Sequence, residues 1–210
     1  MPYAPPAVQA PYGPAGYPGH PAYASPEPRR WENVSSLRLP LLVLLGAEAV
    51  LALVISVVPL AGLLHVLLFL VTAVVFLVWL HRARRNAVAV RHQFGPGWAI
   101  GGWFVPLANV YIPLRVVLDT GWAAVAPDRR ATVTWPVAVW WACWVLSWVT
   151  AFRLTMTERV TATSRSAEFY AGFDLGATWL NSVCLALAAA SLAVVVHRIT
   201  VDQERAVRTR

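Results

Sequence analysis

Glu48 has the most unusual setting of any ionisable residue in this sequence, because it lies inside the apolar stretch of residues 39–58. An ionised carboxylate within a bilayer is costly, so such a residue is expected to face a partner or water, or to be protonated. If the chain folds back after residue 58, Thr72 comes to a similar depth and His65 lies nearer the outer surface. Two interpretations follow: a proton or cation site, and a neutral glutamic acid hydrogen-bonded to a neighbouring helix.

A basic cluster follows the second apolar stretch. It consists of Arg82, Arg84, Arg85, Arg91 and His92. Anchoring of the helix end by anionic lipids is the simplest interpretation of such a cluster. The alternative is a specific site for an anionic ligand, which this cluster would form together with Asn86, Asn109 and Arg115.

Tryptophans crowd the third apolar stretch, at positions 140, 141, 144 and 148. The spacing of 141, 144 and 148 places these three on one face of a helix. Tryptophan usually prefers membrane interfaces, so this density at mid-depth indicates ring packing against other helices. An aromatic cage for a ligand is the alternative.

The sequence contains no recognisable set of catalytic or cofactor-binding residues. Its five histidines have no zinc-ligand spacing with cysteine or acidic residues, and it has no nucleotide-binding glycine motif and no nucleophile motif. We therefore expect no metal, no cofactor and no enzymatic activity.

Composition places the chain among integral membrane proteins of all-α class. Hydrophobic residues make up 58% of the 210 residues and charged residues only 13%, and the hydrophobic residues form long runs. The net charge of +7 comes from arginines at the ends of these runs. Membrane topology explains that position more simply than nucleic-acid binding does.

The apolar runs predict a four-helix transmembrane domain over residues 37–200. The expected spans are 39–58, 63–80, 134–152 and 176–196, followed by a C-terminal tail over residues 201–210. Residues 1–36 are expected to be a disordered tail, since residues 1–28 hold nine prolines and four tyrosines but no Leu, Ile or Phe. Such a tail could dock into the aromatic-lined groove of a protein partner.

Residues 97–118 form a fifth apolar run that we do not expect to span the membrane. Gly101, Gly102, Pro106 and Pro113 would interrupt the helical hydrogen bonds that a lipid-exposed span requires. With four spans, 14 of the 17 arginines lie on one side: 3 in the tail, 7 between the second and third spans, and 4 at the C-terminal end. The positive-inside rule then places both termini in the cytoplasm, with 97–118 as a re-entrant or interfacial cytoplasmic segment.

Three stretches of the sequence resemble a known family: "WLHRARRNA" (79–87), "WAIGGWFVPLANVYIPLRVVLD" (98–119) and "WWACW" (140–144). Together they are similar to the actinobacterial membrane proteins of the domain of unknown function 4328 family, over roughly residues 40–200. The resemblance implies the membrane fold and no particular chemistry. It marks these signature positions: Trp79, Arg82, Asn86, Trp98, Gly102, Trp103, Pro106, Asn109 and Pro113.

These observations favour a non-enzymatic interaction or scaffold protein of the bacterial plasma membrane. Its expected partners are the bilayer, anionic lipids of the inner leaflet, a protein bound through the Pro/Tyr tail, and further copies of the chain. The alternative is an oligomeric small transporter or channel subunit that uses Glu48 and the loop 97–117 as a polar pathway.

Overall fold

The computed structural model describes residues 31–58, 60–87, 94–160, 165–173 and 179–208, with side chains given outside 153–171 and 173. Residues 1–30 of the expected tail (1–36) and the basic residues Arg91 and His92 lie outside the described residues, and a helix begins at Ser35, inside the expected tail. The described chain belongs to one unit of the protein, which starts at Trp31.

Four long helices carry the apolar runs. They are α1 (Ser35–Ile55), α2 (Ala61–Asn86), α5 (Ala131–Ala151) and α6 (Trp179–Arg208). Each is long and apolar enough to cross a membrane, α5 together with the short helix before it. This confirms the all-α helical bundle with four candidate membrane spans that was predicted from the sequence. Helix α2 continues beyond residue 80 and α6 continues beyond residue 196, past the ends of their apolar runs. Neither extension contains a residue that strongly disfavours a helix.

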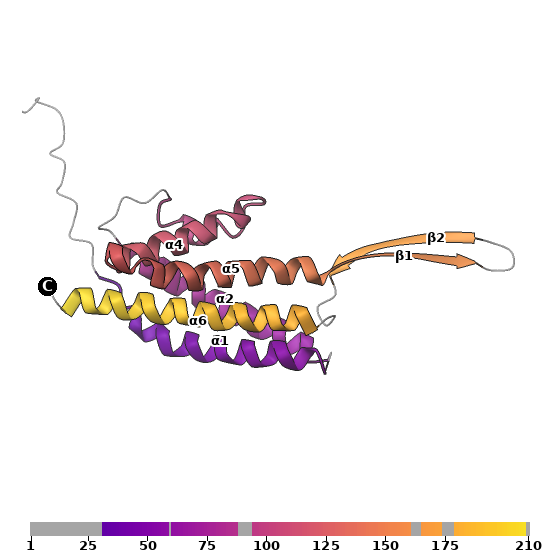
Figure 1. Cartoon of the computed structure of the whole chain (residues 1–210), viewed down its shortest axis with the longest axis horizontal. Helices are drawn as coiled ribbons and strands as arrows, with labels where there is room; N and C mark the ends of the chain where they lie inside the picture. The colour runs from indigo at the N-terminus through magenta and orange to yellow at the C-terminus, as the bar shows by residue number, and fades with distance from the viewer. Residues whose placement is uncertain (1–30, 59, 88–93, 161–164, 174–178, 209–210) are drawn as a thin grey trace, which may run out of the picture. The chain divides into compact units, whose positions relative to one another are not determined.

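Successive spans alternate in direction, so one end of the bundle holds the beginnings of α1 and α5 and the ends of α2 and α6 (Figure 1). We call this end the termini face and the opposite end the hairpin face. The main packing joins α2 to α1, α1 to α6 and α6 to α5. Side chains such as Leu41, Val137 and Val195 are fully buried between these helices.

The connection between α2 and α5 begins and ends at the termini face. It contains α3 (Trp98–Gly101), the short helix η1 (Ala108–Val110), α4 (Ile112–Ala124) and the short helix η2 (Pro127–Arg129). Helix α4 packs on α5 and α6 beside the bundle. The ring of Trp103 contacts Trp141, about 15 Å along α5 from its start at 1.5 Å per residue. Residues 97–118 therefore turn back beside the bundle and do not form a fifth long helix, as the glycines and prolines predicted. We call residues 97–118 the re-entrant segment.

A β-hairpin follows α5, which the sequence analysis did not predict. Strand β1 (Phe152–Val160) pairs antiparallel with β2 (Arg165–Phe173). Its period-2 pattern, with Phe152, Leu154 and Met156 alternating with polar residues, is typical of strands. The two strands extend from the end of the bundle that is opposite the termini face (Figure 1). They follow α5, so the four long helices remain as predicted.

Candidate functional site

Glu48 and His65 form a buried acid–imidazole pair between α1 and α2. The carboxylate Oε2 lies 2.8 Å from the imidazole Nδ1, and only 7% of the Glu48 side chain and 13% of the His65 side chain are exposed. Counting along the chain had placed His65 nearer the outer surface than Thr72, by seven residues or about 10 Å of helix. Thr72, expected at the same depth, donates its hydroxyl hydrogen to the carbonyl of Leu68 at 2.9 Å.

The pair lies at one end of a groove between α2 and α5. A cavity of about 70 Å³ at this end is lined by Glu48, His65 and Thr72, with α6 as its floor. A second cavity of about 210 Å³ continues it toward the termini face. Four residues line both cavities: Phe69, Thr72, Trp140 and Trp144. We call the two together the α2–α5 groove.

The groove changes from polar to apolar along its length. Its polar residues are those near Glu48, whereas the second cavity is lined by aromatic and aliphatic side chains, among them Phe76, Leu77 and Trp103. From His65 to Leu77 the groove follows twelve residues of α2, which is about 18 Å. Phe69 is 43% exposed and Phe104 74% exposed on its rim, so the groove opens sideways.

The tryptophans of α5 pack against one another and against the re-entrant segment. Trp141 stacks on Trp144 with ring centroids 5.0 Å apart, and Trp103 meets the edge of Trp144 at 5.9 Å. The rings of Phe76 and Trp140 join α2 to this group at 6.1 Å. This is the packing role expected for the tryptophans, and it places Trp140 and Trp144 in the wall of the α2–α5 groove.

The end of α2 forms hydrogen bonds with α6 and with the residues before α1. Trp79 is fully buried and donates its indole N–H to Thr200 of α6 at 3.0 Å. Arg82 donates to the carbonyl of Asn33 at 3.2 Å. Asn86 exchanges two hydrogen bonds with the backbone of Glu32, at 2.9 and 2.7 Å. These residues therefore tie the chain before α1, and α6, to the end of α2.

Arg115 and Asn109, which the anionic-ligand interpretation joins to Asn86, have settings of their own. Arg115 pairs with Asp119 one turn along α4, at 3.2 Å, and its guanidinium lies 5.4 Å from the ring centroid of Trp122. The Oδ1 atom of Asn109 is buried without a hydrogen-bond partner in the described part of the chain. The anionic-ligand site stays a prediction.

Arg84 points into the protein, whereas the sequence analysis assigned it to lipid contact. Its side chain is only 1% exposed, and it donates to the carbonyl of Phe94 at 2.7 Å. The guanidinium also lies 4.0 Å from the carboxylate of Asp119. Asp119 thus connects two arginines from α2 and α4, a role that the sequence analysis missed.

The remaining signature residues shape the re-entrant segment. A Cβ atom on Gly102 would lie 2.6 Å from the side chain of Ile112, so glycine allows α3 and α4 to approach closely. Pro113 lies in the first turn of α4, where its missing N–H is tolerated. Pro106 lies in the exposed turn, and Trp98 is 40% exposed with its ring 6.0 Å from Phe94.

Among the described residues, no three His, Cys, Asp or Glu side chains gather as a metal site would require. The chemistry on offer in this region is therefore that of one acid–imidazole pair beside an apolar, aromatic groove.

Comparison with known proteins agrees with the resemblance seen in the sequence. No curated protein and no solved structure matches the chain. The model of one family, described as Domain of unknown function (DUF4328), matches residues 44–201, which include all four spans in whole or in part, the re-entrant segment and the Glu48–His65 pair. The chain therefore belongs to the DUF4328 family.

Proposed function

We propose that the protein is a non-enzymatic interaction protein of the bacterial plasma membrane, and that it binds the hydrocarbon chain of a lipid in the α2–α5 groove. The observation that carries this proposal is the polarity of the groove, which has an ionisable pair at one end and an apolar, aromatic body. Such a cavity suits an amphipathic molecule, with its polar group beside Glu48 and its chain along α2.

The length of the groove supports a lipid chain. The hydrocarbon core of a bilayer is about 30 Å thick, so the chains of one leaflet extend about half of that distance. The groove follows α2 for about 18 Å, and its rim is open where lipid chains surround the bundle. A bilayer lipid could therefore enter sideways without leaving the membrane.

The orientation follows from the arginine distribution. With the termini face in the cytoplasm, the polar end of the groove lies in the outer half of the membrane. His65 is four residues from the start of α2 at the hairpin face, about 6 Å along the helix axis. The ligand would then be a lipid of the outer leaflet. The Pro/Tyr tail would bind its protein partner in the cytoplasm, and this interaction would be the scaffold role.

Filling the groove should remove the bound lipid. Ala73 lines the apolar cavity, and Ala73→Phe would place a ring where the chain lies. Overpacking a filled site costs about 1–3 kcal/mol. Each 1.4 kcal/mol lowers the affinity for the lipid roughly tenfold. Native mass spectrometry of the purified protein should show co-purified lipid on the wild type and little on Ala73→Phe.

The matched control is Val74→Phe, on the next residue of α2, which is 62% exposed and does not line the groove. It adds a ring of the same type and should keep the lipid. Equal lipid occupancy on both variants would contradict the proposal.

A transport role is the second candidate, favoured by the same Glu48–His65 pair, because an acid and an imidazole can pass a proton between them. It would need an oligomer to complete a pathway, since Phe76, Trp79 and Leu80 are packed on the termini side of the groove. Ion or proton flux into liposomes that disappears in Glu48→Gln would favour this role over lipid binding.

A further inference from the structure

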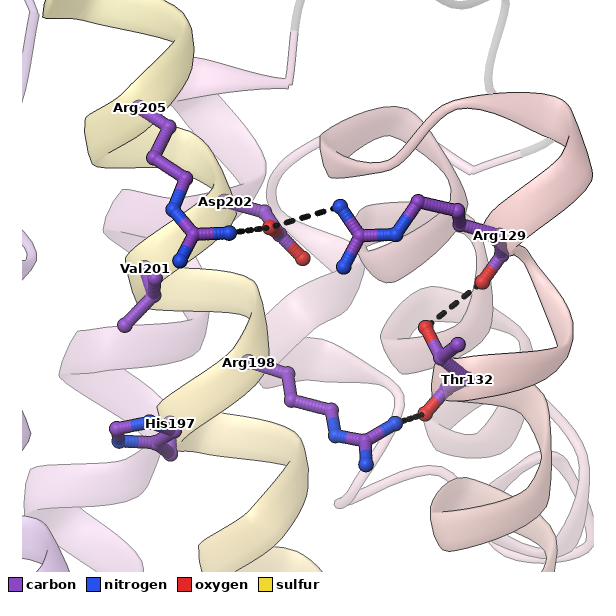
Figure 2. Close-up of a pocket in the computed structure, with 7 residues that line it drawn as sticks. All are labelled: Arg129, Thr132, His197, Arg198, Val201, Asp202 and Arg205. Carbon is purple, nitrogen blue, oxygen red and sulfur yellow. Dashed lines mark hydrogen bonds and ion pairs between the residues drawn. The ribbon is translucent and has the colours of Figure 1, made fainter.

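A second hollow lies at the termini face, away from the α2–α5 groove. It has a volume of about 430 Å³ and is formed by η2, the beginning of α5 and the end of α6 (Figure 2). Its lining residues are Arg129, Thr132, His197, Arg198, Val201, Asp202 and Arg205. Neither the arginine distribution nor the family resemblance singled out this group.

The arginines of the hollow are arranged around one carboxylate. Arg129 and Arg205 approach Asp202 from two elements, with N–O distances of 3.9 and 3.6 Å. Arg198 donates to the backbone carbonyl of Thr132, which fixes it at the side of the hollow. Three guanidinium groups and one carboxylate line the hollow. The 3.9 Å between Arg129 and Asp202 is the distance of a loose ion pair, so the guanidinium of Arg129 can take a second anion.

The hollow lies at the depth of lipid headgroups. It starts directly after the apolar run of α6 that ends at Val196, and from His197 to Arg205 it follows eight residues of the helix. These cover about 12 Å. The polar layer on each side of a bilayer is about 5–8 Å thick, so the hollow overlaps it.

We infer that this hollow binds the phosphate of an anionic phospholipid in the leaflet at the termini face. Guanidinium groups suit this ligand because they offer planar pairs of N–H donors that match phosphate oxygens. A general attraction between arginines and an anionic membrane surface is the alternative. It would depend on the number of arginines and not on which arginines line the hollow. The inference is independent of the lipid proposed for the α2–α5 groove, which has a different polarity and lies at a different depth.

The test compares two double variants with equal change of charge. Arg129→Gln with Arg205→Gln alters the hollow. Arg130→Gln with Arg208→Gln makes the same change of charge outside the hollow, at the residue after η2 and on α6. The full-length protein in detergent is titrated with phosphatidylglycerol and followed by native mass spectrometry. Because the hollow variant loses charge-assisted hydrogen bonds to the phosphate, we expect it to bind at least about tenfold more weakly and the control to stay within about twofold.

Asp202 provides a variant with the opposite expected sign. Asp202→Asn removes the competing carboxylate and should tighten phosphatidylglycerol binding, whereas Glu204→Gln makes the same charge change outside the hollow and should not. Equal effects within either pair of variants would overturn the inference. Glycerol phosphate at millimolar concentration is added to decide the source of the phosphate. If it displaces the lipid, the hollow is a site for soluble phosphates and the lipid assignment is wrong; if it does not, the lipid assignment stands.

Discussion

Replacing Trp79 with alanine should lower the free energy of unfolding by about 3–5 kcal/mol, the range for removing a large buried aromatic side chain. Trp79 is fully buried at the end of α2, and its ring lies 5.9 Å from that of Phe76. Its indole N–H reaches Thr200, so the substitution also leaves a buried hydroxyl without its donor. Reversible unfolding in mixed detergent micelles, followed by tryptophan fluorescence or circular dichroism, measures the change.

The control for Trp79 is Trp135→Ala on α5, where 72% of the side chain is exposed. Exposed substitutions away from packed contacts usually change stability by about 0.5 kcal/mol or less. Similar losses for both tryptophans would mean that Trp79 does not join α2 to α6 as described.

Replacing Asp119 with alanine should cost about 3–5 kcal/mol, because breaking a buried ion pair leaves the other charge uncompensated. Here the charge left behind is Arg84, whose side chain is 1% exposed and lies 4.0 Å from Asp119. Arg115 would lose its partner at the same time. The same micelle unfolding experiment gives the measurement, and Asp128→Ala at an exposed position serves as control.

A double variant separates charge burial from simple loss of packing. Arg84→Met combined with Asp119→Ala removes both charges and should be closer to the wild type than Asp119→Ala alone, because an apolar pair needs no compensation. If the double variant loses as much free energy of unfolding as Arg84→Met and Asp119→Ala lose together, the uncompensated buried charge is not the cause of the loss in Asp119→Ala.

The helical fold could be predicted from the sequence because a helix that crosses a bilayer needs about 20 consecutive apolar residues. Long apolar runs gave the four spans, and the glycines and prolines at 101, 102, 106 and 113 correctly indicated that the fifth run turns back. The matching family model covers both stretches, 79–87 and 98–119, on which the resemblance was seen.

The partners of the polar residues could not be predicted, because they depend on how each helix is rotated about its axis. Arg82 and Arg84 are two residues apart and so about 200° apart around α2. One therefore reaches Asn33 while the other points into the core. Apolar runs with little periodicity do not reveal this rotation. The pairing of Glu48 with His65 and the meeting of Arg129 with Asp202 depend on it in the same way.

The central claim is that the α2–α5 groove holds a lipid chain, and photocrosslinking tests it most directly. The protein in liposomes would be irradiated with a phospholipid that carries a diazirine in its acyl chain, and the modified residues mapped by mass spectrometry. The account predicts that Phe69, Phe76 and Trp103 are labelled more strongly than Val71 and Val74, which are exposed on α2 outside the groove. Labelling of Val71 and Val74 that equals or exceeds labelling of the groove residues would contradict it.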